Sequence, residues 1–245
     1  MKAPAETTVL VVDDEESLRE VLEFEFQRRG YRVLTAASGN QAFAIACAQP
    51  IDVVVSDVRM PDGSGVDLLR RLKERDVQLP VIIFVTAYSD LPAEQAYDMG
   101  VEAILAKPFA AKVLLAVVTR ALQSFDERWR DDGSSTPPEV VLASQRSADE
   151  LAAAGPGLEI GRGGLFLAVD PPPAAETRVS LRIAFTGNPE RSLTGTGIIR
   201  WRRTEAVEGR PIGVGVEILT LDEVSRRTWG PRLAASRVRA FIPLG

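Results

Sequence analysis

The chain has 245 residues, of which 45% are hydrophobic and 6% aromatic, a composition typical of a globular protein with two domains. It contains no histidine, which excludes Ser-His and Cys-His catalytic pairs, the usual zinc sites and a histidine phosphotransfer module within this chain. The net charge of −5 resides in residues 1–125, whereas residues 126–245 carry 16 acidic and 16 basic side chains, which argues against nonspecific nucleic-acid binding.

Residues 8–125 alternate apolar runs with stretches at helical spacing. The first run, Thr-Val-Leu-Val-Val, is continuously apolar, as expected of a strand covered on both faces. Five strand–helix pairs in succession predict an α/β fold with a parallel sheet between two layers of helices. The predicted strands are 8–12, 31–36, 52–57, 80–87 and 101–108, and the predicted helices are 17–30, 39–49, 65–75, 91–100 and 110–125.

The last of these helices carries an apolar stripe that could continue beyond its own sheet. Such a stripe either extends to a partner in a homodimer or covers the sheet and frays, and the sequence leaves both alternatives open. The stripe consists of Leu114, Val118, Ala121, Leu122, Phe125 and Trp129.

The second half changes character after a segment rich in Gly, Ser and Pro at 130–139. We therefore predict a first domain at 1–125, a linker at 126–140 and a second domain at 141–245. In the second domain, short strand-like runs bounded by Gly and Pro predict a small antiparallel β-barrel, closed by a helix over 221–238. These runs are 163–169, 177–186, 193–201 and 212–219.

Five chemically distinctive residues lie at the carboxyl ends of predicted strands of the first domain. Asp13 and Asp14 come directly after the first strand, and Asp57, Thr86 and Lys107 lie at the ends of the third, fourth and fifth. Because the carboxyl ends of parallel strands meet at one edge of the sheet, we expect these side chains to converge. Three carboxylates in one pocket would repel one another without a positive partner, and Mg²⁺ with retained waters fits them as a hard cation.

On these motifs, residues 9–125 resemble a response-regulator receiver domain. The resemblance implies a flavodoxin-like (βα)5 fold in which Asp57 accepts a phosphoryl group from a sensor histidine kinase. A carboxylate can attack phosphorus only when the repulsion between two anions is neutralised, and Mg²⁺ together with Lys107 would do so.

The resemblance also implies individual roles. Asp57 and Asp14 would bind the metal directly, Asp13 would support it through water, and the backbone carbonyl of Arg59 would be a further ligand. Thr86 would donate its hydroxyl to a phosphoryl oxygen once Asp57 is modified.

Three further features concern switching. The Lys107–Pro108 peptide resembles a cis bond of the family, which would aim the lysine into the pocket. The family has Tyr or Phe three residues before the lysine as a switch residue, whereas this chain has Ile104. The coupling between phosphorylation and the surface formed by the fourth helix, the fifth strand and the fifth helix would therefore differ. Arg59 and Tyr88, each two residues beyond Asp57 and Thr86, are placed to tune the lifetime of the modified state.

The second domain resembles a divergent PilZ domain, a small barrel that in many bacterial proteins binds cyclic di-GMP. The family's Asp/Asn-x-Ser-x-x-Gly turn corresponds to 159–164 here, where the serine is replaced by Gly161. The family's upstream Arg-x-x-x-Arg pair is missing, because Arg146 is followed at the fourth position by Glu150. Losing two or three charge-assisted hydrogen bonds would cost roughly two to six decades of affinity. The candidate nucleotide-binding residues are Arg146, Glu159, Gly161, Arg162 and Gly164.

We therefore expect a response regulator whose degenerate PilZ-like domain acts by contacts with an unknown downstream protein. The alternatives are a cyclic di-GMP effector that integrates two signals and, against the charge balance, a DNA-binding transcription regulator. No second catalytic constellation is visible, so we expect no enzyme beyond the receiver's own phosphoryl transfer and autodephosphorylation. No apolar run reaches the ~18 residues of a membrane span, no secretory signal is visible and the single cysteine, Cys47, cannot form an internal disulfide, which together indicate the cytoplasm.

Overall fold

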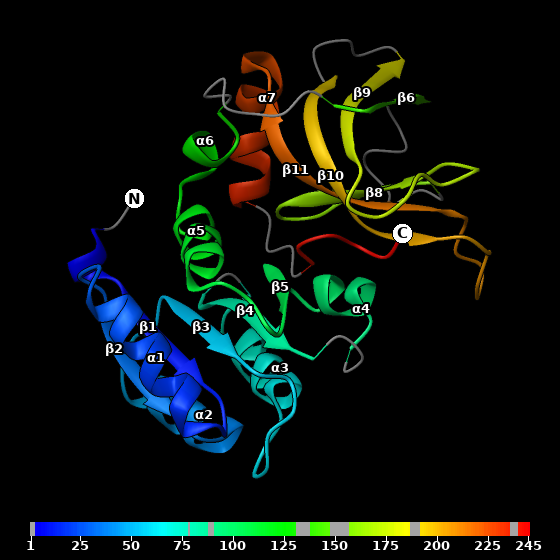
Figure 1. Ribbon diagram of the computed structural model, residues 1–245. Helices are drawn as coiled ribbons and strands as arrows, with labels where there is room; N and C mark the ends of the chain where they lie inside the picture. The colour runs from blue at the N-terminus through cyan, green and yellow to red at the C-terminus, as the bar shows by residue number, and fades with distance from the viewer. Residues whose placement is uncertain are drawn as a thin grey trace. The chain divides into compact units, whose positions relative to one another are not determined.

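In the computed structural model the chain forms two compact units (Figure 1). The first unit comprises Met1–Pro92 and Met99–Gln123, and the second comprises Ala93–Asp98 and Ser124–Gly245. The structure describes residues 3–77, 79–87, 91–130, 138–147, 157–186, 192–235 and 240–245. In this part of the chain, no helix is both long enough and apolar enough to cross a membrane.

The first unit contains a five-stranded parallel sheet with the strand order β2-β1-β3-β4-β5. This topology confirms the predicted flavodoxin-like α/β fold. The strands are β1 (Thr8–Val12), β2 (Arg32–Ala36), β3 (Val53–Ser56), β4 (Val81–Thr86) and β5 (Ala103–Ala106). The helices are the 3-10 turn η1 (Pro4–Glu6), α1 (Glu16–Gln27), α2 (Gly39–Ala48), α3 (Gly65–Arg75) and α5 (Ala111–Ala121).

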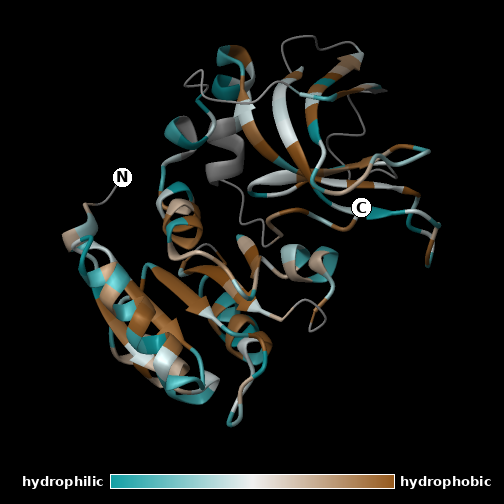
Figure 2. Cartoon of the chain, viewed as in Figure 1, coloured by the Kyte–Doolittle hydropathy of each residue, from teal (hydrophilic) through white to brown (hydrophobic). Residues whose placement is uncertain are grey.

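The continuous apolar runs form the central strands of this sheet. Every residue of β1, β3 and β4 is buried, and Figure 2 shows these strands as the most hydrophobic part of the unit. One face packs against Leu22 and Phe26 of α1 and against Leu114 and Val118 of α5. Burial on both faces explains why these strands lack the apolar–polar alternation of half-exposed strands.

Of the two alternatives for the last helix of the first domain, a continuous helix that reaches Trp129 does not form. Helix α5 ends at Ala121, and a separate turn of helix, α6 (Phe125–Arg128), follows. Trp129 is fully buried in the core of the second unit, and its carbonyl accepts a hydrogen bond from Leu221 N at 2.9 Å. The apolar stripe therefore contributes side chains to two hydrophobic cores, because its last residue, Trp129, belongs to the second unit.

The second unit is built on a six-stranded sheet with the strand order β6-β9-β10-β11-β8-β7. The predicted antiparallel barrel is corrected here to a mixed sheet, because β6 pairs parallel with β9. The reason is that residues 140–147, for which the sequence analysis predicted no strand, form an edge strand. The elements are α4 (Ala93–Asp98), β6 (Val140–Ser147), β7 (Leu158–Ile160), β8 (Gly164–Ala168), β9 (Arg178–Thr186), β10 (Leu193–Arg203), β11 (Gly213–Leu221) and α7 (Glu223–Ala235).

Candidate metal and phosphoacceptor site

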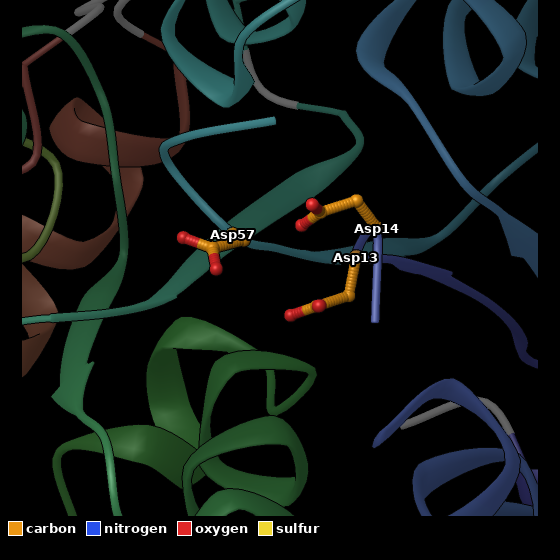
Figure 3. Close-up of side chains that lie close together, drawn as sticks. All are labelled: Asp13, Asp14 and Asp57. Atoms are coloured by element: carbon orange, nitrogen blue, oxygen red, sulfur yellow. The ribbon is translucent and has the colours of Figure 1, made fainter. Parts of the chain in front are cut away.

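Three carboxylates converge at the carboxyl edge of the parallel sheet. Asp13 and Asp14 follow β1, Asp57 follows β3, and one carboxylate oxygen of each lies within 4.8 Å of the other two. Figure 3 shows the carboxylates of Asp13 and Asp14 extending toward the side of the site where Asp57 lies. Asp13 and Asp57 are buried, whereas Asp14 is exposed. An all-oxygen set of this kind, open to solvent on one side, fits a hard divalent cation that keeps some of its waters.

Lys107 supplies the positive charge of the site. Its Nζ lies 2.7 Å from Asp13 Oδ2 and 2.5 Å from Asp57 Oδ2. Burial by itself would lower the pKa of Lys107, but its hydrogen bonds to Asp13 and Asp57 and their negative charges outweigh burial and raise that pKa. The lysine therefore remains charged beside Asp57. The Lys107–Pro108 peptide bond is cis, as the sequence predicted.

The Asp57 carboxylate is held by the backbone of the loop that follows β3. Asp57 Oδ1 accepts hydrogen bonds from Val58 N at 2.5 Å and from Arg59 N at 3.2 Å. Ser56 Oγ donates to the carbonyl of Asp57 at 2.7 Å. These bonds fix Oδ1 and direct Oδ2 toward Lys107. The sequence analysis missed Ser56, although its position inside a buried apolar strand was a usable signal.

Thr86 and Ile104 occupy the positions expected of them. Thr86 is the last residue of β4 and is buried, and its carbonyl accepts a hydrogen bond from Lys107 N at 2.9 Å. Ile104 is half-buried in β5 and pairs with Phe84 of β4. Tyr88 lies outside the described residues.

Gly65 allows the backbone of α3 to approach the loop between β3 and α3 closely. It begins α3, and its N–H donates to the carbonyl of Val58 at 3.0 Å. A Cβ at this position would clash with the carbonyl oxygen of Asp57. Replacing a helical glycine by alanine ordinarily stabilises a helix by about 0.5–1 kcal/mol, but here we expect Gly65→Ala to destabilise the first unit by roughly 1–3 kcal/mol. Urea unfolding of the two proteins measures the sign, and a stabilised variant would contradict this account.

The candidate nucleotide-binding turn is occupied by the chain itself. Arg162 N donates to the carbonyl of Ala240 at 2.9 Å, and Gly163 N donates to the carbonyl of Phe241 at 3.0 Å. Gly245 N donates to Glu159 Oε2 at 3.2 Å. The segment 240–245 therefore uses the backbone donors that an anionic ligand would need at this turn.

The remaining candidates for the nucleotide site do not assemble a clamp either. Arg162 is 7% exposed, with its guanidinium carbon 5.7 Å from the centre of the Phe241 ring. Gly161 lies so close to the carbonyl of Phe241 that its lack of a Cβ is a packing requirement, and Gly164 is similarly packed against β11. The backbone of Arg146 belongs to β6, which stands at the opposite end of the strand order from β7, and its side chain lies outside the described part of the chain.

Comparison with known proteins matches the first unit. The family model described as "Response regulator receiver domain" matches residues 9–119. The transcriptional regulator NtrC of Salmonella typhimurium is 41% identical over 121 residues, which are 49% of this chain and 26% of NtrC. The transcriptional regulatory protein FixJ of Rhizobium meliloti is 34% identical over 154 residues, which are 62% of this chain and 75% of FixJ.

A solved receiver-domain protein of Clostridium thermocellum is 33% identical with a TM-score of 0.45, and the match covers 47% of this chain and 94% of that one. The chain belongs to the response-regulator family, and residues 9–119 are its receiver domain. The match spans about a quarter of the length of NtrC, so the activity of the whole NtrC protein is not attributed to this chain.

The comparisons give no support to the predicted PilZ-like identity of the second unit or to cyclic di-GMP as its ligand. The prediction that DNA is an unlikely partner is also not supported, because the matched relatives are transcription regulators. The receiver assignment is confirmed by the family match, and the predicted convergence of Asp13, Asp14 and Asp57 is present in the structure.

Proposed function

We propose that the chain is a phosphorylation-controlled response regulator in which Asp57 accepts a phosphoryl group from the phosphohistidine of a sensor kinase. The observation that carries this proposal is the position of Asp57, which lies within 4.8 Å of Asp13 and Asp14 and contacts Lys107. A buried carboxylate beside two others and one ammonium is suited to bind a cation and an anionic phosphoryl donor together.

In this reaction an oxygen of Asp57 attacks phosphorus. The phosphorus–nitrogen bond of the donor breaks, and the departing imidazole nitrogen keeps the electron pair. Bound Mg²⁺ supplies charge neutralisation for the phosphoryl oxygens, and Asp13, Asp14, Asp57 and the backbone of Arg59 are the residues that would hold it. Lys107 stabilises the charge on the transferred group, and the N–H groups of Val58 and Arg59 orient the acceptor.

After transfer, Thr86 and Lys107 act on the product. Both residues stand at the ends of adjacent strands and are linked by the backbone hydrogen bond from Lys107 N to the carbonyl of Thr86. The hydroxyl of Thr86 donates to a phosphoryl oxygen in this proposal. Water then hydrolyses the aspartyl phosphate, which returns the carboxylate and releases phosphate.

Incubation of the full chain with acetyl phosphate and Mg²⁺ tests this function. We expect intact mass spectrometry to show the addition of one phosphoryl group. Chelation of divalent cations with EDTA should reduce the rate by at least about a hundredfold, because the repulsion between Asp57 and the donor is then left to Lys107 alone. Unmodified protein in the presence of Mg²⁺, or equal rates with and without EDTA, would contradict the proposal.

For the output of the second unit we propose contacts with a downstream macromolecule, with two candidates. A protein partner is the prediction from its charge balance, whereas duplex DNA is favoured by the description of NtrC as a DNA-binding transcriptional regulator. Electrophoretic mobility shift at low salt, with random duplexes and with the phosphorylated and unmodified full chain, separates them. A shift that weakens steeply with added salt would establish DNA, and its absence would leave the protein partner.

The cyclic di-GMP alternative makes a separate prediction. Because the segment 240–245 occupies the donors of Arg162 and Gly163, we expect equilibrium dialysis with labelled cyclic di-GMP to detect no binding in the micromolar range. Micromolar binding would show that this segment leaves the turn and would restore the sensor hypothesis.

A further inference from the structure

The sheet of the second unit has one face packed on the core and one face directed away from it. Strand β9 shows this division, because Val179 and Leu181 are buried in the core, whereas the residues that alternate with them point outward. Residues 240–245 cover the β8 part of the outward face, where Gly245 lies against the ring of Phe166. The described outward side chains of β6 and β9, in contrast, are exposed or half-exposed.

The uncovered part of this face has an apolar centre between charged ends. Val141 of β6 is 55% exposed and pairs with Ser180 of β9, which stands midway between Arg178 and Arg182. Within the described part of the chain, neither arginine side chain makes a hydrogen bond or an ion pair. Glu139 is exposed and stands beside Arg178, whose carbonyl accepts its N–H at 2.9 Å. We call the line from Arg182 through the Val141–Ser180 pair to Glu139 the sheet row.

The free charge of Arg182 differs from the other charges of this sheet. Arg200 of β10 is paired with Glu217 at 2.7 Å and with Glu176 at 3.1 Å. Arg203 of the same strand donates to two backbone carbonyls. These two guanidinium groups are compensated within the chain, whereas the exposed end of Arg182 is available to a carboxylate from outside it.

Helix α1 of the first unit presents a surface of the complementary kind. Its side away from the sheet carries Phe24 and Val21, which are 60% and 55% exposed and adjoin one another on the helix. Glu20 lies one turn before Phe24, Arg28 lies one turn after it, and both are exposed. We call the line Glu20, Phe24 and Arg28 the α1 row. The exposure of its aromatic ring to water costs free energy that an apolar partner surface would remove.

The two rows match in spacing and in the sign of their charges. Residues four apart on a helix are separated by about 6 Å along its axis, which is the spacing within the α1 row. Residues two apart on a strand are separated by about 6.6 Å, which is the spacing within the sheet row. If Phe24 lies on Val141, the carboxylate of Glu20 reaches the arginine end of the sheet row. The other ends then bring Arg28 to Glu139.

Both rows are exposed within one chain, so a partner for either comes from another molecule. We propose that the chain self-associates head to tail, with the α1 row of one copy docked on the sheet row of a second copy. The occupant is a second copy because the complementary surface is present in the same sequence, whose residues 1–125 carry the net charge of −5. The contact joins two different surfaces, which makes it heterologous. It does not depend on the proposed phosphorylation of Asp57.

Sedimentation equilibrium of the full chain at low salt measures this association. We expect the weight-average mass of wild type to rise above the monomer mass of 26.6 kDa as the concentration is raised through about 10–500 µM. Phe24→Ala removes the central ring, and Arg182→Glu places a like charge opposite Glu20. Each should weaken the association by at least about tenfold. Added salt should weaken the wild-type association as well, because the charged ends of both rows are exposed.

Mixing the two variants distinguishes a head-to-tail contact from a symmetric one. Phe24→Ala keeps a wild-type sheet row, and Arg182→Glu keeps a wild-type α1 row. An equimolar mixture should therefore associate through one intact contact and form a species of two chains, although each variant alone stays monomeric. Val113→Ala on α5, at a residue 47% exposed, and Arg227→Glu on α7, at a side chain 82% exposed, make matched changes elsewhere and should associate as wild type.

Three results would overturn the inference: a wild type that stays monomeric over this range, an association unchanged in both variants, or a mixture of the variants that stays monomeric. Far-UV circular dichroism should show both variants folded, because both side chains are exposed. Both should also accept a phosphoryl group from acetyl phosphate as wild type does. A loss of association with phosphorylation intact therefore reports on the contact between copies and leaves the proposed function of Asp57 standing.

Discussion

Replacing Asp57 by alanine should abolish stoichiometric phosphorylation by acetyl phosphate and Mg²⁺. The variant keeps Asp13, Asp14 and Lys107 but loses the only carboxylate that Val58 N and Arg59 N hold in position at this site. Asp13 is already bound by Lys107 and by Glu15 N, and Asp14 is exposed, so neither is oriented as a replacement acceptor. Intact mass spectrometry over a time course gives the measurement.

The matched control is Asp67→Ala, at an exposed carboxylate in the first turn of α3. This variant should be phosphorylated at the wild-type rate. Far-UV circular dichroism should show both variants folded, so that the loss in Asp57→Ala reports the chemistry of the acceptor. A phosphoryl group on the Asp57→Ala protein, in the amount found for wild type, would place the acceptor elsewhere.

The convergence of the acidic side chains and Lys107 could be predicted from sequence because its signals are local. Strands β1, β3 and β5 are each followed at once by a residue of the site, as in Val12-Asp13-Asp14 and Ser56-Asp57, and Thr86 is the last residue of β4. Parallel topology then brings these residues together without any further information from the chain. What the sequence did not reveal is the fine positioning of Asp57, which depends on Ser56 and on the space left by Gly65.

The second unit was predicted less well because its defining contacts are long-range. The parallel pairing of β6 with β9 joins residues about forty positions apart, and the hydrophobic pattern of residues 140–147 does not predict this pairing. Similarly, no local signal indicates that Phe241 covers Gly163 or that Tyr97 packs on Phe241. The glycines at 161–164 were interpreted as a ligand turn, whereas the structure uses them to admit another part of the chain.

Trp129→Ala should destabilise the second unit by about 3–5 kcal/mol, the range found for deleting a large buried aromatic side chain. Trp129 is fully buried among apolar side chains of the second core, although it lies within the segment 126–140 that the sequence predicted as a linker. Because domains are stable by only about 5–15 kcal/mol, such a loss should lower the urea midpoint strongly. Far-UV circular dichroism during urea unfolding measures it, and mass spectrometry should show that Asp57 still accepts a phosphoryl group.

This variant also tests the homodimer interpretation of the apolar stripe against burial of Trp129 in the second core. If Trp129 contributed to a homodimer, its replacement would change the assembly seen by size-exclusion chromatography and leave the monomer's stability almost intact. If it belongs to the second core, stability falls and the effect is intramolecular. Val224→Ala, at a residue 56% exposed in α7, is the control and should shift the midpoint by less than about 0.5 kcal/mol. If the urea midpoint of Trp129→Ala shifted no more than that of Val224→Ala, the Trp129 side chain would not stabilise the second unit.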